Sequence, residues 1–345
     1  MESLHLCARR LLLQAAVLIP TLTASPLFAA HDCRFQVNGS SWTLLGDCTT
    51  DSTLYVPDGV TLDGKGYTIR ANNPTTGTFQ GAVVQNAGST AHIVSLRVVG
   101  ENLAGACATG DARLKGIALS KASGSILNSV VEGIHRGTST CEEGNAIDVS
   151  NPPYDGTHPA SVSVTLAGNH VLGYQKTGLA INGDVVASVQ GNTIGRAFDA
   201  ALVAANGVQL GYGARGDLRE NVLEGNEFNQ ISDPQLFSTA MLVYQAAQAR
   251  LMSNVTDGEG TDVGVAIFES SSIHVVGSTL GRTTDVADVV DAYGVGLWFS
   301  GNSGMLRMGK NTYNGWNDSL RFDNATARAA QQRDKVLSLC SPYRP

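Results

Sequence analysis

A short strand-like unit recurs along most of this chain, and few folds can accommodate it. Each unit starts with a small residue and places two apolar residues at alternating positions, as in residues 178–182 (GLAIN). This period of two predicts short β-strands that each bury one face. The aligned units begin at Gly116, Ala146, Gly178, Gly207, Ala240, Gly264 and Gly294. Because one unit cannot bury its apolar face alone, the repeat predicts a solenoid of stacked coils.

A second unit follows each strand and reads apolar-x-x-Asn-x-apolar, as in residues 218–223 (LRENVL). Its polar position recurs at Ser95, Asn128, Asn169, Asn192, Asn221, Asn254, Ser278 and Asn311. The intervals vary between 23 and 41 residues, which is typical of a solenoid with loops inserted in some coils. Stacked Asn side chains can hydrogen-bond to one another and tolerate tight turns. We therefore interpret these residues as structural rather than catalytic.

Residues 55–69 (YVPDGVTLDGKGYTI) resemble the first coil of the pectin-lyase-like superfamily, and the resemblance extends over roughly residues 50–322. It implies a right-handed parallel β-helix. The superfamily holds lyases, glycosidases, esterases, epimerases and non-enzymes on this scaffold, so the resemblance does not imply one activity. The sequence lacks the signature motifs of polygalacturonases, pectate lyases, pectin methylesterases and mannuronan epimerases. No catalytic residue can therefore be assigned by motif.

The predicted fold class is all-β. We expect a single right-handed parallel β-helix, or solenoid, over residues 55–322, an N-terminal cap over 31–54 and a short C-terminal helical tail over 323–345. The composition agrees, because 39 of the 345 residues are Gly and only 15% are charged, which suits a tightly turning β architecture. Helix signals are scarce between the strands, which argues against a βαβ fold.

The first 30 residues have the organisation of a secretory signal peptide. Arg9 and Arg10 precede an apolar run over residues 11–22, and small residues end at Ala29 and Ala30. The apolar run is too short to span a bilayer, which needs about 20 residues. We expect a secreted or periplasmic protein with no transmembrane segment in the mature chain.

Five cysteines remain after the predicted signal peptide, and in an exported protein they are expected to pair. A Cys33–Cys48 bond would close the N-terminal cap, and a Cys107–Cys141 bond would tie two loops together. Cys340 is then left over. CxxC, HxH and HExxH spacings are absent from the sequence, so no metal site is predicted and no cofactor is assigned.

The charge of the chain restricts its partners. The formal net charge is −7, and loss of residues 1–30 makes it more negative, because two arginines and one glutamate leave. An acidic chain without a basic run argues against nucleic acid or an anionic membrane as partner. Polysaccharide is the partner that the superfamily resemblance favours, and the oligomeric state is left open.

Tyr244, Phe268 and Trp298 are the predicted substrate-binding residues. In the alignment they fall in one outward-facing column on consecutive coils, which lie about 4.8 Å apart. Such an aromatic stripe would stack on sugar rings. The alternative is that the C-terminal tail covers the stripe with Val336, Leu337 and Leu339.

The long insertion at residues 132–160 supplies the predicted catalytic residues, because loops on a rigid scaffold often carry function. They are Asp148, Asp155, Arg136 and His158. A lyase needs a base, which is often Lys or Arg in this superfamily. An inverting glycosidase needs two carboxylates about 6.5–9.5 Å apart. For each of these residues an ordinary solvated charge is the favoured alternative, because loops often carry charge without function.

Three functions remain open at this stage. The first is a secreted module that binds extracellular polysaccharide without catalysis. The second is an enzyme, either a polysaccharide lyase or a glycoside hydrolase. The third is a structural envelope protein, for which only the stack and its caps matter.

The strand phase is testable by substitution. Leu210→Asp or Ile181→Asp is expected to unfold the protein, because each would bury an unpaired charge. Asp148→Ala is the control and is expected to change stability little, because its side chain is predicted to point outward. Thermal unfolding followed by circular dichroism measures both effects. Unchanged stability of the Leu210 variant would contradict the alignment.

Overall fold

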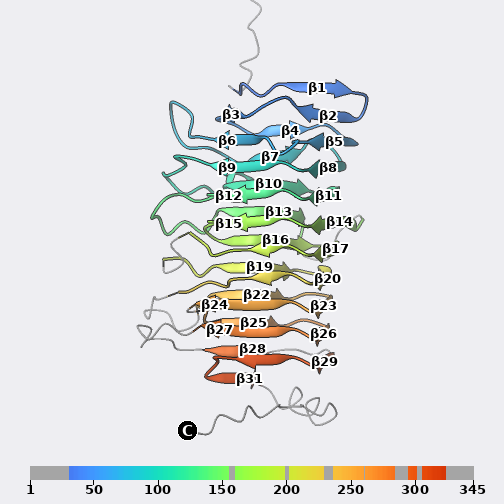
Figure 1. The fold of residues 1–345 in the computed structure, drawn as a ribbon, viewed down its shortest axis with the longest axis vertical. Coiled ribbons are helices and arrows are strands. Elements are labelled where there is room, and N and C mark those ends of the chain that lie inside the picture. The colour runs from blue at the N-terminus through green and yellow to red at the C-terminus, as the bar shows by residue number, and fades with distance from the viewer. Residues whose placement is uncertain are drawn as a thin grey trace, which may run out of the picture.

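The computed structural model describes residues 31–154, 160–198, 202–228, 236–259, 261–283, 294–300 and 305–323. Figure 1 shows the strands stacked as successive coils along one axis, from β1 at the top to β31 at the bottom. The predicted signal peptide lies outside the described residues, as does the predicted helical tail apart from Asp323. Within the described ranges no helix is long and apolar enough to span a bilayer.

The strands form three sheets, and each full coil adds one strand to each sheet. Sheet C holds β4 (Leu54–Val56), β7 (Ala82–Asn86), β10 (Lys115–Ser120), β13 (Asn145–Asn151), β16 (Thr177–Gly183), β19 (Asn206–Gly211), β22 (Thr239–Tyr244), β25 (Val263–Phe268), β28 (Val295–Ser300) and β31 (Asp318–Phe322).

Sheet B holds β1 (Phe35–Asn38), β2 (Ser41–Leu44), β5 (Val60–Asp63), β8 (Thr90–Val94), β11 (Ser123–Leu127), β14 (Val162–Ala167), β17 (Val185–Gln190), β20 (Arg215–Arg219), β23 (Gln248–Met252), β26 (Ser272–Val276) and β29 (Met305–Gly309). Sheet A holds β3 (Cys48–Thr50), β6 (Thr68–Ala71), β9 (Arg97–Gly100), β12 (Val130–Glu132), β15 (His170–Leu172), β18 (Thr193–Ile194), β21 (Val222–Leu223), β24 (Val255–Glu259), β27 (Thr279–Thr283) and β30 (Thr312–Asn314).

Neighbouring coils pair in parallel, and the antiparallel pair β1–β2 closes the N-terminal end of sheet B. The expected right-handed parallel β-helix is therefore confirmed. A disulfide between Cys33 and Cys48 fastens the N-terminal end, as predicted.

Alternating side chains of all three sheets meet in one continuous core. Ile181 lies between Val149 and Leu210 in the register of sheet C, and all three side chains are fully buried. The predicted inward positions of these units are thus confirmed. The stack buries what a single coil would leave exposed.

The alignment of the last unit was wrong by two residues. In the structure Leu297 pairs with Val265, and Trp298 pairs with Ala266 rather than with Phe268. The unit therefore begins at Gly296 and not at Gly294. A shift of two residues keeps every side chain on the same face of the strand, so apolar alternation could not detect the error.

A ladder of buried polar side chains occupies the turn between sheets B and A. Asn169, Asn192, Asn221 and Asn254 each receive the backbone N–H of the preceding ladder residue on their side-chain oxygen, at 3.0 Å. The amide nitrogens of the same four side chains donate to strand carbonyls at 2.8–3.0 Å. Ser278 and Asn311 continue the ladder. The structural interpretation of these asparagines is confirmed.

Two residues assigned to this ladder lie one position too early. Ser129 and Leu96 occupy the ladder positions of their coils, because Leu96 donates its N–H to the Ser129 hydroxyl. Asn128 and Ser95 are the preceding residues and have φ angles of 49° and 50°. Asn tolerates this left-handed conformation and is also the usual residue of the ladder. The sequence pattern therefore could not distinguish the ladder position from the position before it.

Removal of one ladder side chain tests how much the ladder stabilises the fold. Asn221→Ala should lower the free energy of unfolding by about 2–4 kcal/mol, because it leaves the Val189 carbonyl and the Asn192 amide groups buried without this partner. Asn128→Gly is the control, since Gly adopts positive φ without strain, and its effect should stay below about 1 kcal/mol. Urea unfolding measures both. Equal effects of the two changes would argue against the ladder as a main stabilising element.

Candidate functional site

The outer face of sheet C carries a groove. Two hollows of about 620 and 380 Å³ open on it, and both are lined by Asp111, Lys115, Asp148 and Ser150. Together they extend along the solenoid axis from β4 to β19. We call this combined feature the groove.

One column of outward side chains forms the floor of the groove. Its members, one from each of six consecutive strands of sheet C, are Tyr55, Gln85, Ala118, Asp148, Ala180 and Gln209. The strand pairing places each member directly beside the next. The column is therefore a straight line of polar side chains that is interrupted only by two alanines.

Asp148 lies at the centre of this floor. Its neighbours in the column, Ala118 and Ala180, are small, so neither covers the carboxylate from along the axis. The Asn145 side chain donates to Asp148 Oδ2 at 2.7 Å. Asp148 points outward, as predicted, but only 7% of its surface is exposed because the groove walls enclose it.

Hydrogen-bonding groups flank the floor on both sides. Lys115, Asn145 and Thr177 precede it on their strands, and Ser150 and Asn182 follow it. The Gln209 side chain of the floor donates to Asn182 Oδ1 at 3.0 Å. Amides and hydroxyls of this kind offer both donors and acceptors to a ligand.

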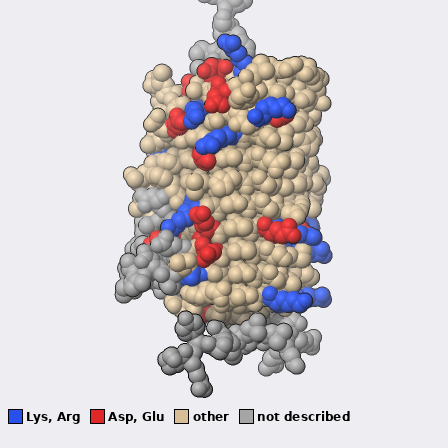
Figure 2. All heavy atoms as spheres, viewed as in Figure 1, with Lys and Arg blue, Asp and Glu red and all other residues tan. Residues whose placement is uncertain are grey.

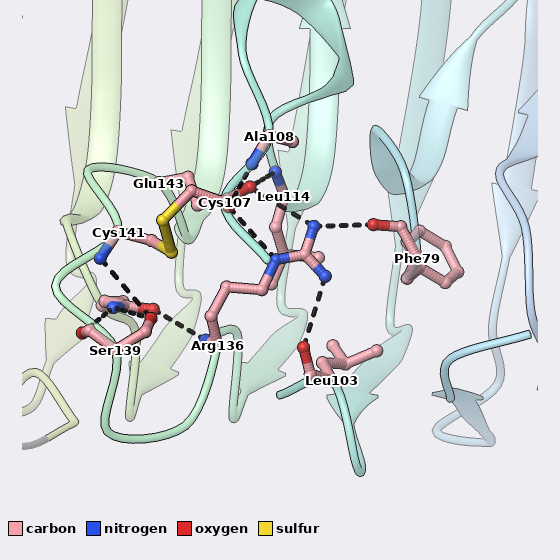
Figure 3. Close-up of a disulfide and its surroundings, with 10 residues drawn as sticks. Phe79, Leu103, Cys107, Ala108, Leu114, Arg136, Ser139, Cys141 and Glu143 are labelled. Carbon is pink, nitrogen blue, oxygen red and sulfur yellow. Dashed lines mark hydrogen bonds and ion pairs between the residues drawn. A yellow bond between two sulfur atoms is a disulfide. The ribbon is translucent and has the colours of Figure 1, made fainter. Parts of the chain in front are cut away.

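One wall of the groove comes from the loop around the 3₁₀ turn η1 (Gly110–Ala112) and from Glu143. The Glu143 carboxylate accepts the backbone N–H groups of Ala108 at 2.8 Å and Leu114 at 2.6 Å. It therefore holds both ends of the segment that includes η1. The predicted disulfide Cys107–Cys141 is present and joins this segment to the loop that carries Glu143 (Figure 3).

Arg136 lies inside this wall and not in the groove. Figure 3 shows its guanidinium between Glu143, Phe79 and Leu103. It pairs with Glu143 Oε1 at 3.2 Å and donates to the carbonyls of Phe79 at 2.6 Å and Leu103 at 3.3 Å. None of its side chain is exposed. The candidate catalytic role is corrected to a structural one, because a base must reach the substrate proton.

The opposite wall carries two tyrosines, neither of which is among the predicted site residues. Tyr154 and Tyr212 stack with ring centroids 5.2 Å apart, and Tyr212 meets Tyr244 edge-on at 5.5 Å. Burial and the nearby Asp148 carboxylate raise the pKa of Tyr154 to about 12, so its hydroxyl keeps its proton at neutral pH. Both residues follow sheet C strands that are two coils apart, a closeness that no local pattern reveals.

The predicted aromatic stripe has a different arrangement. Tyr244 and Phe268 are neighbours in the register, whereas Trp298 belongs to the floor column beside Ala266. Trp298 packs edge-on against Phe268 at 5.2 Å, and its indole N–H donates to Asp323 Oδ2 at 2.7 Å. Only 9% of Trp298 is exposed. Its ring is therefore not an open stacking platform.

Trp298 instead belongs to a second apolar cluster, which also contains Val263, Ala266 and Val295. This cluster continues the floor column beyond Gln209, so the outer face of sheet C changes from polar to apolar along its length. Asp155 and His158, the other two predicted catalytic residues, lie outside the described residues.

Charges in the groove are nearly balanced. The cationic lining residues are Arg113, Lys115 and Lys176, and the acidic ones are Asp111, Glu142, Glu143 and Asp148. Glu142 pairs with Lys176, and Glu143 with Arg136. Figure 2 likewise shows Lys and Arg side chains mostly beside Asp and Glu on the face drawn there. The groove therefore does not select a ligand by a strong field of one sign.

Neither a family model nor a curated protein sequence matches the chain. Among solved structures it is similar to XylC in complex with xylose, at 10% identity and a TM-score of 0.34, over 66% of this chain and 38% of that one. It is also similar to the A-module of the mannuronan C-5 epimerase AlgE4 from Azotobacter vinelandii, at 12% identity and a TM-score of 0.34, over 82% and 86% of the two chains.

A third similar structure is an alginate lyase from Paenibacillus sp. str. FPU-7, at 14% identity and a TM-score of 0.32, over 78% of this chain and 92% of that one. The chain thus spans little more than a third of XylC but most of the other two proteins. At such low identities the likeness concerns the fold alone.

The buried ion pair of the wall can be tested by truncation. Arg136→Ala should lower the free energy of unfolding by about 3–5 kcal/mol, because Glu143 would keep a buried charge without its cation. Arg97→Ala is the matched control: it removes the partner of Glu132 from an exposed pair, and its effect should stay below about 1 kcal/mol. Urea unfolding gives both values. Similar losses in the two variants would contradict the role assigned to Arg136.

Proposed function

We propose that this protein binds an extended polysaccharide chain in the groove on sheet C. The observation that carries the proposal is the straight floor column from Tyr55 to Gln209, with Asp148 at its centre. Coils repeat about every 4.8 Å, which is close to the length of one sugar unit. Consecutive sugars along the axis would therefore meet consecutive strands.

The lining suits hydroxyl-rich rings. The amides come from Asn145, Asn182 and Gln209, and the hydroxyl groups come from Ser150 and Thr177. A ligand with many donors and acceptors can pair with such groups, whereas an apolar ligand would leave them unpaired. The balanced charge favours a neutral or weakly charged stretch of chain. Two disulfides are consistent with an extracellular or periplasmic protein, where such polymers occur.

A catalytic role for the same groove is the second candidate. Asp148 is an enclosed carboxylate on the floor, and the neutral Tyr154 hydroxyl lies near it. Asp111 lines both hollows and would be the second carboxylate of a hydrolase, while Lys115 would be the base of a lyase. A structural envelope role, by contrast, requires no ligand in the groove.

A panel of neutral and uronate polysaccharides tests the proposal. The full chain is examined by affinity electrophoresis, and release of reducing or unsaturated ends is followed in the same samples. Gln209→Ala and Asp148→Asn should each weaken binding at least about tenfold, which corresponds to about 1.4 kcal/mol. Thr165→Ala, on the outer face of sheet B, is the control and should leave binding unchanged.

The outcomes separate the three functions. Product release that Asp148→Asn abolishes would identify an enzyme. Binding without product, weakened by both groove variants, would identify a binding module. Binding that neither groove variant weakens would contradict the groove, and the absence of any binding would favour the structural role.

A further inference from the structure

The outer face of sheet B changes character towards its C-terminal end. Asp217, Arg250, His274 and Arg307 stand beside one another in the register of β20, β23, β26 and β29. They alternate with core residues such as Leu218 and Leu251, so they all lie on the outer side of the sheet. This column therefore places one basic or imidazole side chain on each of three consecutive coils.

Among the described strands, acidic residues offset this column only at its Asp217 end, where the carboxylate interacts electrostatically with Arg250. Strands β23, β26 and β29 contain no Asp or Glu. The nearest acid in the column, Asp217, is already held by two hydrogen bonds from Arg219, which lower the pKa of its carboxyl. Lys310 follows β29 directly and adds a further positive charge at the edge.

Arg250 and Arg307 also differ from several other exposed arginines. Arg70 pairs with Glu101 at 2.6 Å, and Arg97 pairs with Glu132 at 2.7 Å. Among the described residues, no carboxylate lies within ion-pair distance of Arg250 or Arg307. The Arg307 guanidinium instead contacts the Met305 sulfur, from Nε at 3.1 Å. Neither guanidinium is therefore held in an ion pair by a described residue, and Asp217, beside Arg250 in the column, is the acid that acts on it.

The edge of the column that faces sheet A has only short turns. Only two residues separate β23 from β24, β26 from β27, and β29 from β30, so no loop rises at that edge. Met305 and Val276 are exposed beside the cations, at 53% and 36%. An edge without long loops leaves room for an extended chain beside the column.

We propose that the outer face of β20, β23, β26 and β29 is a second binding surface, which holds an acidic polysaccharide along the solenoid axis. Carboxylate or sulfate groups on successive sugars would meet Arg250, His274 and Arg307 on successive coils. Arginine suits this contact because its planar guanidinium binds carboxylate and sulfate groups through two parallel hydrogen bonds. The surface is distinct from the groove, which lies on sheet C and is nearly balanced in charge.

Charge density selects this partner over nucleic acid. Double-stranded DNA carries one negative charge about every 1.7 Å of its axis, so a chain with net charge −7 repels it more strongly than it repels a less densely charged polyuronate. A uronate chain carries one charge per sugar. That density matches one arginine or histidine side chain on each coil, about 4.8 Å apart.

The test uses polygalacturonate and the full chain, with binding measured by affinity electrophoresis at low ionic strength. Arg250→Ser combined with Arg307→Ser should weaken binding at least about tenfold. The matched control combines Arg70→Ser with Arg97→Ser, which removes the same charge from sheet A and should stay within about twofold of the natural chain. Raising the salt from about 50 to 200 mM should abolish the difference between the variants.

Several outcomes would overturn the second surface. An equal loss of binding in both double variants would mean that the net charge of the chain alone explains the effect. Retention of full binding by the Arg250/Arg307 variant, with loss in Asp148→Asn, would assign the acidic polymer to the groove. The chain could instead bind duplex DNA or vesicles of anionic lipid with the same arginine dependence and fail to bind polygalacturonate. That result would identify the DNA or the lipid, and not a polysaccharide, as the partner. Thermal unfolding of each variant confirms that it is folded.

Discussion

The register between successive coils is the constraint on which the rest of this structure depends. Parallel pairing aligns each residue of one strand with a residue one coil away, and the buried ladder through Asn169, Asn192, Asn221 and Asn254 fixes the same alignment in the turn between sheets B and A. A slip of one residue would turn the core face of a strand to solvent. The side-chain ladder gives such a slip a further penalty, because its buried amides would lose their partners.

The groove follows from this register together with the loops that border it. Small residues on either side of Asp148 keep the floor open, and long connections on both edges of sheet C supply the walls. The wall around Glu143 is held by a buried ion pair, two backbone hydrogen bonds and a disulfide. Burial of Arg136 is tolerated because carbonyl groups and the Glu143 carboxylate satisfy its guanidinium.

Two faces of one solenoid thus offer different physical chemistry. The groove on sheet C offers enclosed amide and hydroxyl groups, whose hydrogen bonds respond weakly to salt. The exposed column with Arg250, His274 and Arg307 on sheet B offers arginine charges, whose interactions salt screens. Because both faces run along the same axis at the same repeat, a single scaffold can present two parallel tracks to extended chains.

The apolar period of two determined the fold, the stacking of coils and the outward direction of Asp148, because these depend on how each short segment buries its own residues. The two disulfides also agreed with the order of the cysteines along the chain. Position along a column was harder to predict: the last unit was misplaced by two residues, and Asn128 and Ser95 were misplaced by one.

Only the tertiary structure decided which residues meet across coils. Arg136 appeared to be an exposed loop cation, yet its guanidinium binds the carbonyl of Phe79, 57 residues earlier in the chain. Tyr154 and Tyr212 meet across two coils, and Trp298 is enclosed by residues from other strands. Local periodicity specifies which face of a strand is buried. Contacts between residues that are distant in the chain depend on loop lengths and on packing that has no period. The sequence pattern therefore cannot specify which distant side chain contacts a given residue.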